Sequence, residues 1–173
     1  MKTRCGVLLL LLLVGAVSLM ANADRSMSNP GEIMKKLTPN MMVEDVHQTL
    51  DFYCNTLGFK FVGGVPEGTQ ELVLEPDPHK ALAFAILQQG PVQMMFQSRT
   101  SLSAELPMFA QKAIGASATI YIEVDNAQEL YTKIKDKITL VRPLHTTFYG
   151  MNEFYVKDIN GYVLCFGSKV ATD

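Results

Sequence analysis

The chain has 173 residues, of which 15 are basic and 17 acidic, and its formal net charge is −2. This length favours a single domain, which can bury a core without disulfide bonds. The mild acidic balance provides no basic patch for a nucleic acid and no polybasic segment for a membrane surface. We therefore expect neither kind of partner for the folded part of the chain.

The N-terminal segment has the three parts of a secretory signal peptide. A short basic region contains Lys2 and Arg4, and an apolar run over residues 6–20 follows it. The segment Ala21–Ala23 then offers the small residues of a cleavage site. A transmembrane anchor is the alternative, but a span needs roughly 20 apolar residues and this run is shorter. We expect cleavage before Asp24, and hence a periplasmic or secreted protein that does not contact the membrane.

Cleavage at this point would change the charge and the cysteine content. It removes Lys2, Arg4 and no acidic residue, so the 15 basic residues become 13 against 17 acidic ones. Cys54 and Cys165 remain. An oxidising compartment permits a disulfide bond, but the first cysteine lies in a predicted helix and the second in a predicted strand. We therefore expect two free, buried thiols.

Regular patterns begin after a polar leader over residues 24–36, which predicts a flexible segment. Residues 38–43 predict a strand, and Asp45 is a plausible N-cap of the helix that follows. Gly58 ends that helix, and residues 59–62 predict a strand that ends at Gly63 and Gly64. Strands are then predicted over residues 71–74, 81–88 and 92–97. The helical spacing is carried by Val46, Leu50, Tyr53 and Leu57.

The same pattern recurs 81 positions further along the chain. Thr38 and Val43 correspond to Thr119 and Val124, and the strand-to-helix junction keeps its register. A repeat at this spacing indicates two copies of one supersecondary unit. Later strands are predicted around residues 146–149, 153–156 and 162–166, with a turn over 158–161, and a short helix over 106–113 in the connection between the copies. The helical positions of the second copy are Ala127, Tyr131, Ile134 and Ile138.

Three motifs resemble those of the vicinal oxygen chelate superfamily, the group of glyoxalases, bleomycin-resistance proteins and extradiol dioxygenases. The first is Val43–Val46 with Phe52-Tyr53 and Leu57–Phe59, and Val124–Ala127 is its weaker counterpart. The third is Tyr149–Tyr162, which is similar to the closing motif of bleomycin-resistance-like members. The resemblance covers residues 37–168 and implies an α+β fold of two β-α-β-β-β modules that form a partly open barrel around one cavity.

The resemblance also implies a domain plan and an assembly. Module one is expected over residues 37–98, a linker over 99–117, module two over 118–168 and a tail over 169–173. Many family members are dimers, so we expect a homodimer.

Metal-dependent members of this family take one ligand from each of four strands, usually His, Glu or Gln. The resemblance maps these positions onto Thr38, Gln93, Thr119 and Cys165. Only Gln93 is of a usual ligand type, so we predict no metal and no other cofactor. A divalent metal held by displaced ligands is the alternative. His47, His79 and His145 lie on different predicted elements, and we expect them at the surface.

Candidates for other chemistry are few. Cys165 has apolar neighbours and no histidine tied to it by a motif, so we expect an inert thiol. Glu123 and Glu153 could serve as a general base if they face the cavity. Alternation along the strand from Thr119 points Tyr121 and Glu123 inward. The alternative for Glu123 is a rim carboxylate in water, because glutamates are rarely buried.

The predicted cavity combines apolar surface with uncharged hydrogen-bonding groups, which suits a small, partly aromatic or amphipathic ligand. The two glutamates would favour a cationic one. Our first hypothesis is a binding protein that sequesters a compound, as bleomycin-resistance-type members do. The alternatives are a metal-dependent lyase, isomerase or dioxygenase of the superfamily, and a non-catalytic dimeric interaction module. The predicted cavity residues are Asn40, Met42, Gln93, Met95, Gln97, Thr119, Tyr121, Glu123 and Tyr149.

Overall fold

The computed structural model describes residues 33–171. The predicted signal peptide over residues 1–23, residues 24–32 of the leader and the last two residues of the tail lie outside the described residues. Within residues 33–171, no helix combines the length and the apolar character that a membrane span requires.

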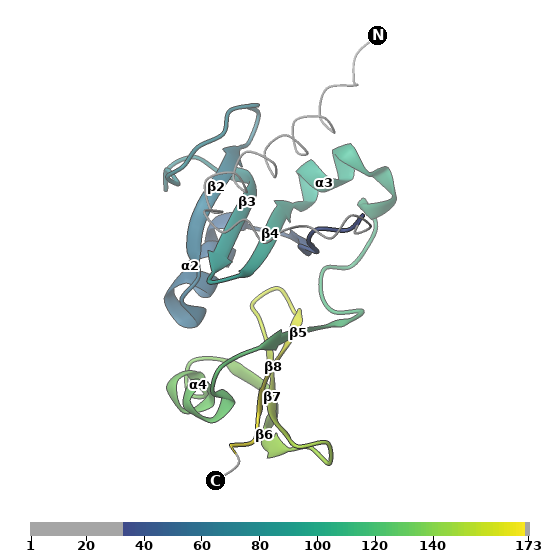
Figure 1. Cartoon of the computed structure of the whole chain (residues 1–173). Coiled ribbons are helices and arrows are strands. Elements are labelled where there is room, and N and C mark those ends of the chain that lie inside the picture. The colour runs from purple at the N-terminus through teal and green to yellow at the C-terminus, as the bar shows by residue number, and fades with distance from the viewer. Residues whose placement is uncertain (1–32, 172–173) are drawn as a thin grey trace. The chain divides into compact units, whose positions relative to one another are not determined.

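The chain divides into two compact units, and each contains one four-stranded sheet (Figure 1). Unit 1 comprises the residues up to His47 together with Lys60–Gln111, and unit 2 comprises Gln48–Phe59 together with the residues from Lys112 onwards. The helix α2 (Val46–Leu57) therefore belongs, for most of its length, to the second unit. We describe each unit by itself.

Unit 1 contains sheet A, whose strand order is β1-β4-β3-β2. β1 runs parallel to β4, and the other neighbours are antiparallel. On one face of the sheet, Val65, Phe84 and Ile86 form an apolar cluster with Val62 and Met95. The elements are β1 (Asn40–Val43), β2 (Lys60–Pro66), β3 (Leu82–Gln89), β4 (Val92–Ser98), α3 (Arg99–Glu105) and the 3-10 helix η1 (Pro107–Phe109).

Unit 2 contains sheet B, with the corresponding order β5-β8-β7-β6 and the same single parallel pair, β5 with β8. Helix α4 (Ala127–Ile134) covers one face, where Tyr131 packs edge-on against Phe154 at 5.3 Å between ring centroids. Phe154 in turn stacks on Phe166, also at 5.3 Å. The strands are β5 (Thr119–Glu123), β6 (Thr139–Thr146), β7 (Met151–Lys157) and β8 (Val163–Lys169).

The predicted α+β class and the two β-α-β-β-β modules are confirmed by the element order. The predicted end of the first helix is also confirmed. Gly58 has a positive φ of 76°, and its N–H donates to Cys54 O while the Phe59 N–H donates to Tyr53 O. This left-handed position satisfies carbonyls at the helix end, and glycine adopts it without steric strain. Both cysteines are free, Cys165 buried and Cys54 half-buried.

Four local predictions in the strands and the linker were wrong. Gly63 and Gly64 do not end the second strand but lie inside β2. A register shift falls between Phe61 and Gly63, and a Cβ on Gly64 would lie 2.7 Å from the Phe84 carbonyl oxygen. Gly64 therefore permits close approach of the neighbouring strand rather than a turn. Residues 71–74 form no strand, and only Val73 makes an isolated bridge, to Gly64.

The other two errors concern a helix and a strand boundary. The connection forms its helix at α3, earlier than residues 106–113, because the Ser98 side chain caps it by accepting from the Ser101 N–H at 3.2 Å. Only η1 follows. Residues 146–149 are not a separate strand, since β6 continues to Thr146 and then turns into β7.

Helix α2 is fastened to the turn between β7 and β8 within unit 2. The Tyr53 hydroxyl donates to Asp158 Oδ2 at 2.9 Å. Asp158 Oδ1 accepts from the backbone N–H groups of Asn160 at 2.9 Å and Tyr162 at 2.7 Å. The Asn160 side chain donates to Thr49 Oγ1 at 3.0 Å. Burial raises the pKa of Asp158, while the bonds from Tyr53, Tyr162 and Asn160 act to lower it.

The change Tyr53→Phe removes one donor from this buried carboxylate and should cost about 1.5–3 kcal/mol of unfolding free energy at neutral pH. The pKa of Asp158 in the folded state would rise further, so ionisation of Asp158 would cost the variant more stability as the pH rises through that pKa. The difference between the two proteins should therefore shrink as the pH falls through it. Urea unfolding over a pH series measures this.

Tyr131→Phe is the matched control, and it should change the unfolding free energy by less than about 0.5 kcal/mol. An equal loss in the two variants, or a loss for Tyr53→Phe that does not change with pH, would contradict this account of the Asp158 turn.

Candidate functional site

The face of sheet B opposite α4 carries a buried carboxylate bonded to two tyrosines. Glu153 on β7 is 2% exposed. Its Oε1 accepts from the Tyr149 hydroxyl at 3.0 Å, and its Oε2 accepts from the Tyr155 hydroxyl at 3.2 Å. The turn before β7 places Tyr149 within reach of Glu153. In this turn Gly150 adopts a positive φ of 79° and its N–H donates to Thr147 O. Glu153 is therefore held in one orientation by groups from a strand and a turn.

A third tyrosine joins this cluster from β5. Tyr121 is opposite Cys165 in the parallel pair β5 and β8, and the next inward position on β8 is Gly167. A Cβ on Gly167 would overlap the Tyr121 hydroxyl. The missing side chain thus makes the space in which this hydroxyl lies. Gly167 is opposite Glu153 on its other side, so the Tyr121 hydroxyl lies near the carboxylate. We call Tyr121, Tyr149, Glu153 and Tyr155 the tyrosine–glutamate cluster.

The electrostatics of the cluster follow from this arrangement. The hydrogen bond to Glu153 raises the pKa of Tyr149. Burial and then the charge of Glu153 raise the pKa of Tyr121. The hydrogen bond with Cys165 and burial raise the pKa of Tyr155. All three phenols are thus kept protonated at neutral pH, where their hydroxyls act as neutral donors.

The other predicted residues of module two lie at the rim or beside the cluster. Thr119 and Glu123 are exposed, and Tyr121 is half-exposed at 49%. Tyr155 and His145 were not predicted as part of a site. They lie side by side, with stacked rings 6.3 Å apart, and His145 is opposite Glu153 in the register of β6 and β7. Alternation along β7 from Glu153 could have identified Tyr155.

The predicted polar residues of module one are already hydrogen-bonded within unit 1. Gln97 is 2% exposed; its Oε1 accepts from Asn40 at 2.8 Å and its Nε2 donates to Ser101 and Glu105. Gln93 accepts from Lys36 at 3.1 Å. Met42 is buried, and Met95 belongs to the apolar cluster of sheet A. This face of sheet A is therefore largely closed within its own unit, and only Asn40 of the five is exposed.

The two sheets can be compared position by position through their registers. Gln97 on β4 is opposite Phe84, and Met95 is opposite Ile86. The corresponding pairs in sheet B are Gly167 with Glu153 and Cys165 with Tyr155. Two apolar core residues of module one, Phe84 and Ile86, are thus replaced in module two by a carboxylate and a phenol. The same topology therefore accommodates an apolar pair at these positions.

The residues at the family's metal positions do not fit a divalent ion. Burial raises the pKa of the Cys165 thiol, which disfavours the thiolate that binds metals. Gln93 accepts from the Lys36 ammonium, a charge that repels a cation. By register, Met95 rather than Gln93 corresponds to Cys165. Among residues 33–171, no three side chains of His, Cys, Asp or Glu are grouped closely enough to hold a metal ion.

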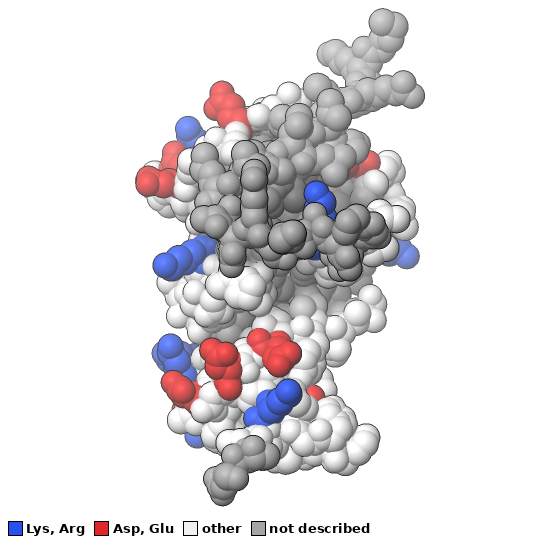
Figure 2. Space-filling view, in the orientation of Figure 1, with Lys and Arg blue, Asp and Glu red and all other residues white. Residues whose placement is uncertain are grey.

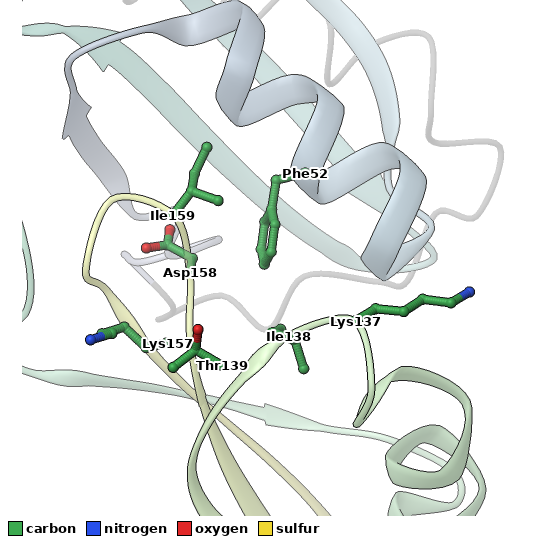
Figure 3. Close-up of a pocket in the computed structure, with 7 residues that line it drawn as sticks. All are labelled: Phe52, Lys137, Ile138, Thr139, Lys157, Asp158 and Ile159. Carbon is green, nitrogen blue, oxygen red and sulfur yellow. The ribbon is translucent and has the colours of Figure 1, made fainter.

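A second candidate in unit 2 is a pocket of about 370 Å³ beside α2 (Figure 3). Figure 3 shows the side chains of Lys137 and Lys157 extending away from it in opposite directions. The Asp158 carboxylate at its wall is already bonded to Tyr53. Polar groups that converge on one point are typical of a ligand site, and this pocket lacks them in the part of the chain that is described. It is lined by Phe52, Lys137, Ile138, Thr139, Lys157, Asp158 and Ile159.

Surface charge singles out no further site on the face drawn in Figure 2, where acidic and basic side chains of the described residues are interspersed. The ion pairs between described residues are Lys80 with Asp77 at 3.8 Å and Arg99 with Glu44 at 2.7 Å. Both lie in unit 1. We therefore take the tyrosine–glutamate cluster as the candidate site.

Comparison with known proteins gives a family match and structural neighbours. Residues 35–166 match the family described as Glyoxalase/Bleomycin resistance protein/Dioxygenase superfamily. A search of curated proteins finds no match.

Among solved structures, a protein of unknown function from Agrobacterium tumefaciens has a TM-score of 0.60 at 19% identity, covering 82% of this chain and 98% of that one. A family enzyme from Burkholderia phytofirmans has a TM-score of 0.59 at 17% identity, covering 79% and 100%. A superfamily member from Sphaerobacter thermophilus has a TM-score of 0.56 at 17% identity, and the match covers 80% of this chain and 100% of that one. At these identities the likeness concerns the fold.

The change Gly167→Ala tests whether the Tyr121 hydroxyl lies over Gly167. The new methyl group should displace the Tyr121 hydroxyl, but a half-exposed ring can swing outward, so the unfolding free energy should change by less than about 1 kcal/mol. The ring resonances of Tyr121 in a tyrosine-labelled NMR spectrum should shift, while those of Tyr131 on the opposite face should not. An unchanged Tyr121 spectrum would contradict this placement.

Proposed function

This chain belongs to the Glyoxalase/Bleomycin resistance protein/Dioxygenase superfamily, and on that premise we propose that it binds an organic small molecule at the tyrosine–glutamate cluster, without a metal. Binding would sequester the compound, as the resemblance to bleomycin-resistance-type members implies. The signal peptide predicted over residues 1–23 supports a role outside the cytoplasm.

One observation carries this proposal, the convergence of three phenols on a buried carboxylate. Glu153 is 2% exposed and accepts from two tyrosines, so it is oriented before any ligand arrives. Tyr121 and Tyr149 remain 49% and 57% exposed. Aromatic side chains provide large contact areas and lose little entropy when they are already held in place. A fixed polar centre beside partly exposed aromatic rings suits a small amphipathic ligand.

The poor fit to a metal supports binding without an ion. The positions that would supply ligands are occupied by threonines, an amide already bonded to Lys36 and a thiol whose pKa is raised. Hydrogen bonds and aromatic contacts are then the means of recognition that the cluster offers. We place the ligand on unit 2, since the amides of Gln93 and Gln97 on sheet A are already bonded to other side chains of unit 1.

The test is an NMR screen of the purified protein in the presence of a metal chelator, with a fragment library of neutral, cationic and anionic compounds. Binding should shift the ring resonances of Tyr121, Tyr149 and Tyr155 and leave those of Tyr131 unchanged. Tyr149→Leu should weaken the best compound about tenfold, since losing one aromatic contact costs about 1 kcal/mol or more.

The library should also find no compound that binds only after a divalent ion is added. A screen without any binder, or one whose binders perturb the pocket beside Phe52 instead of the three tyrosines, would overturn the proposal.

A further inference from the structure

Glu153 is buried without a basic partner on the face of sheet B that carries the three tyrosines. Its oxygens accept from Tyr149 and Tyr155, and no ion pair to it is formed among the described residues. Moving a carboxylate out of water is costly, and neutral donors compensate only part of that cost. The charge of an ionised Glu153 is therefore not cancelled within this face of sheet B.

The neighbouring basic groups do not neutralise it. By register Arg142 is opposite Tyr155 and Lys157 is opposite Val163, and both are exposed. His145 is opposite Glu153, but its ring stacks on Tyr155 and its Nδ1 lies 3.0 Å from Pro143 O. Glu123, at the open end of β5, adds a second acid to the same face. Two carboxyl groups, Glu153 at the centre and Glu123 at the open end of β5, thus lie on the same face as the aromatic rings, and neither forms an ion pair among the described residues.

Packing does not explain why this carboxylate is present. The equivalent positions of module one hold Phe84 and Ile86, exposed by 2% and 0%, and they close sheet A with apolar contacts. An apolar side chain could therefore fill the same position without the free-energy cost of burying a polar group. A buried acid on which phenols converge, at positions that are apolar in the first copy, is the kind of polar arrangement that fixes a ligand.

We propose that the tyrosine–glutamate cluster recognises an organic cation with a quaternary or other bulky ammonium group; this inference rests on the proposed function and specifies its ligand. Aromatic faces attract such cations through the ring quadrupole. Glu153 adds a charge that acts through space, because its own oxygens are covered by the tyrosine hydroxyls. A cation without N–H donors needs no hydrogen bond to these covered oxygens. A primary ammonium or a metal ion, by contrast, would need direct contact with them.

Three probes of nearly the same shape separate charge from size. Choline carries a quaternary ammonium, 3,3-dimethylbutan-1-ol is its neutral counterpart, and 3,3-dimethylbutanoate is an anionic one. Each is titrated into the purified protein while the ring resonances of Tyr121, Tyr149 and Tyr155 are followed. Choline should bind about tenfold or more tighter than the neutral alcohol, as expected for a desolvated cation over aromatic rings.

Variants assign the preference to the cluster. Glu153→Gln keeps the shape of the side chain and an acceptor for a tyrosine, so its ratio of choline to alcohol affinity should fall towards one. Tyr149→Phe keeps the ring and should retain choline binding within about threefold, while Tyr149→Leu should lose about tenfold. Glu71→Gln, an exposed acid in unit 1, removes the same charge and should change nothing. Tyr121→Leu, at a half-exposed position, provides a second test if Glu153→Gln does not fold.

Each contrary outcome is informative. Equal binding of choline and the alcohol, or tighter binding of the anion, would overturn the cationic ligand and leave the proposed binding function standing. A response of the three tyrosines to choline that persists unchanged in Glu153→Gln and in Tyr121→Leu would overturn the assignment to this cluster. If neither these probes nor any library compound binds, the proposed function itself fails.

Discussion

The turn fixed by Asp158 sets the register on which the candidate site depends. Its carboxylate holds two backbone N–H groups of the turn and the Tyr53 hydroxyl of α2. That turn pairs β7 with β8 so that Glu153 is opposite Gly167 and Tyr155 is opposite Cys165. A shift by one residue would move every side chain of β7 to the other face of the sheet. Glu153 would then point towards α4, and Phe154 would enter the site.

The two modules share one topology and use its equivalent positions in different ways. In module one, an Asn40–Gln97 bond and the Phe84–Ile86 pair close the face of sheet A. In module two, Gly167 replaces the glutamine and makes room for Tyr121. A small residue in one strand thus permits a large one in its neighbour. The same face is therefore closed by apolar and amide contacts in module one and carries a partly exposed polar cluster in module two.

Much of the fold could be predicted from the sequence because helix spacing and end signals are local. Val46 to Leu57 at helical spacing, ended by Gly58, gave both bounds of α2. Features that depend on neighbouring strands were missed. Gly63 and Gly64 resemble a turn in isolation, yet the close approach of Phe84 O is what requires a glycine at position 64. The helix of the linker was misplaced because its start is set by the Ser98 cap.

The candidate site was predictable only in part, for the same reason. Alternation placed Tyr121 on the inward face, and the family motif identified Tyr149. Cross-strand pairing, which no single segment reveals, brings His145 opposite Glu153 and Tyr155 opposite Cys165. Gln93 and Gln97 were predicted as cavity residues because they are polar and lie on the inward face of sheet A. Their bonds to Lys36 and Asn40 join segments that are 57 residues apart in sequence, and this pairing is not visible in the sequence.

The central claim is that this member of the superfamily recognises its ligand without a metal. The most direct measurement is the metal content, by mass spectrometry, of the protein purified without chelator and offered a mixture of divalent ions. Our account predicts less than about a tenth of an equivalent per chain, because the residues at the family positions are poor ligands. About one equivalent per chain, lost in a Gln93→Ala variant, would contradict the account and would identify a metal site.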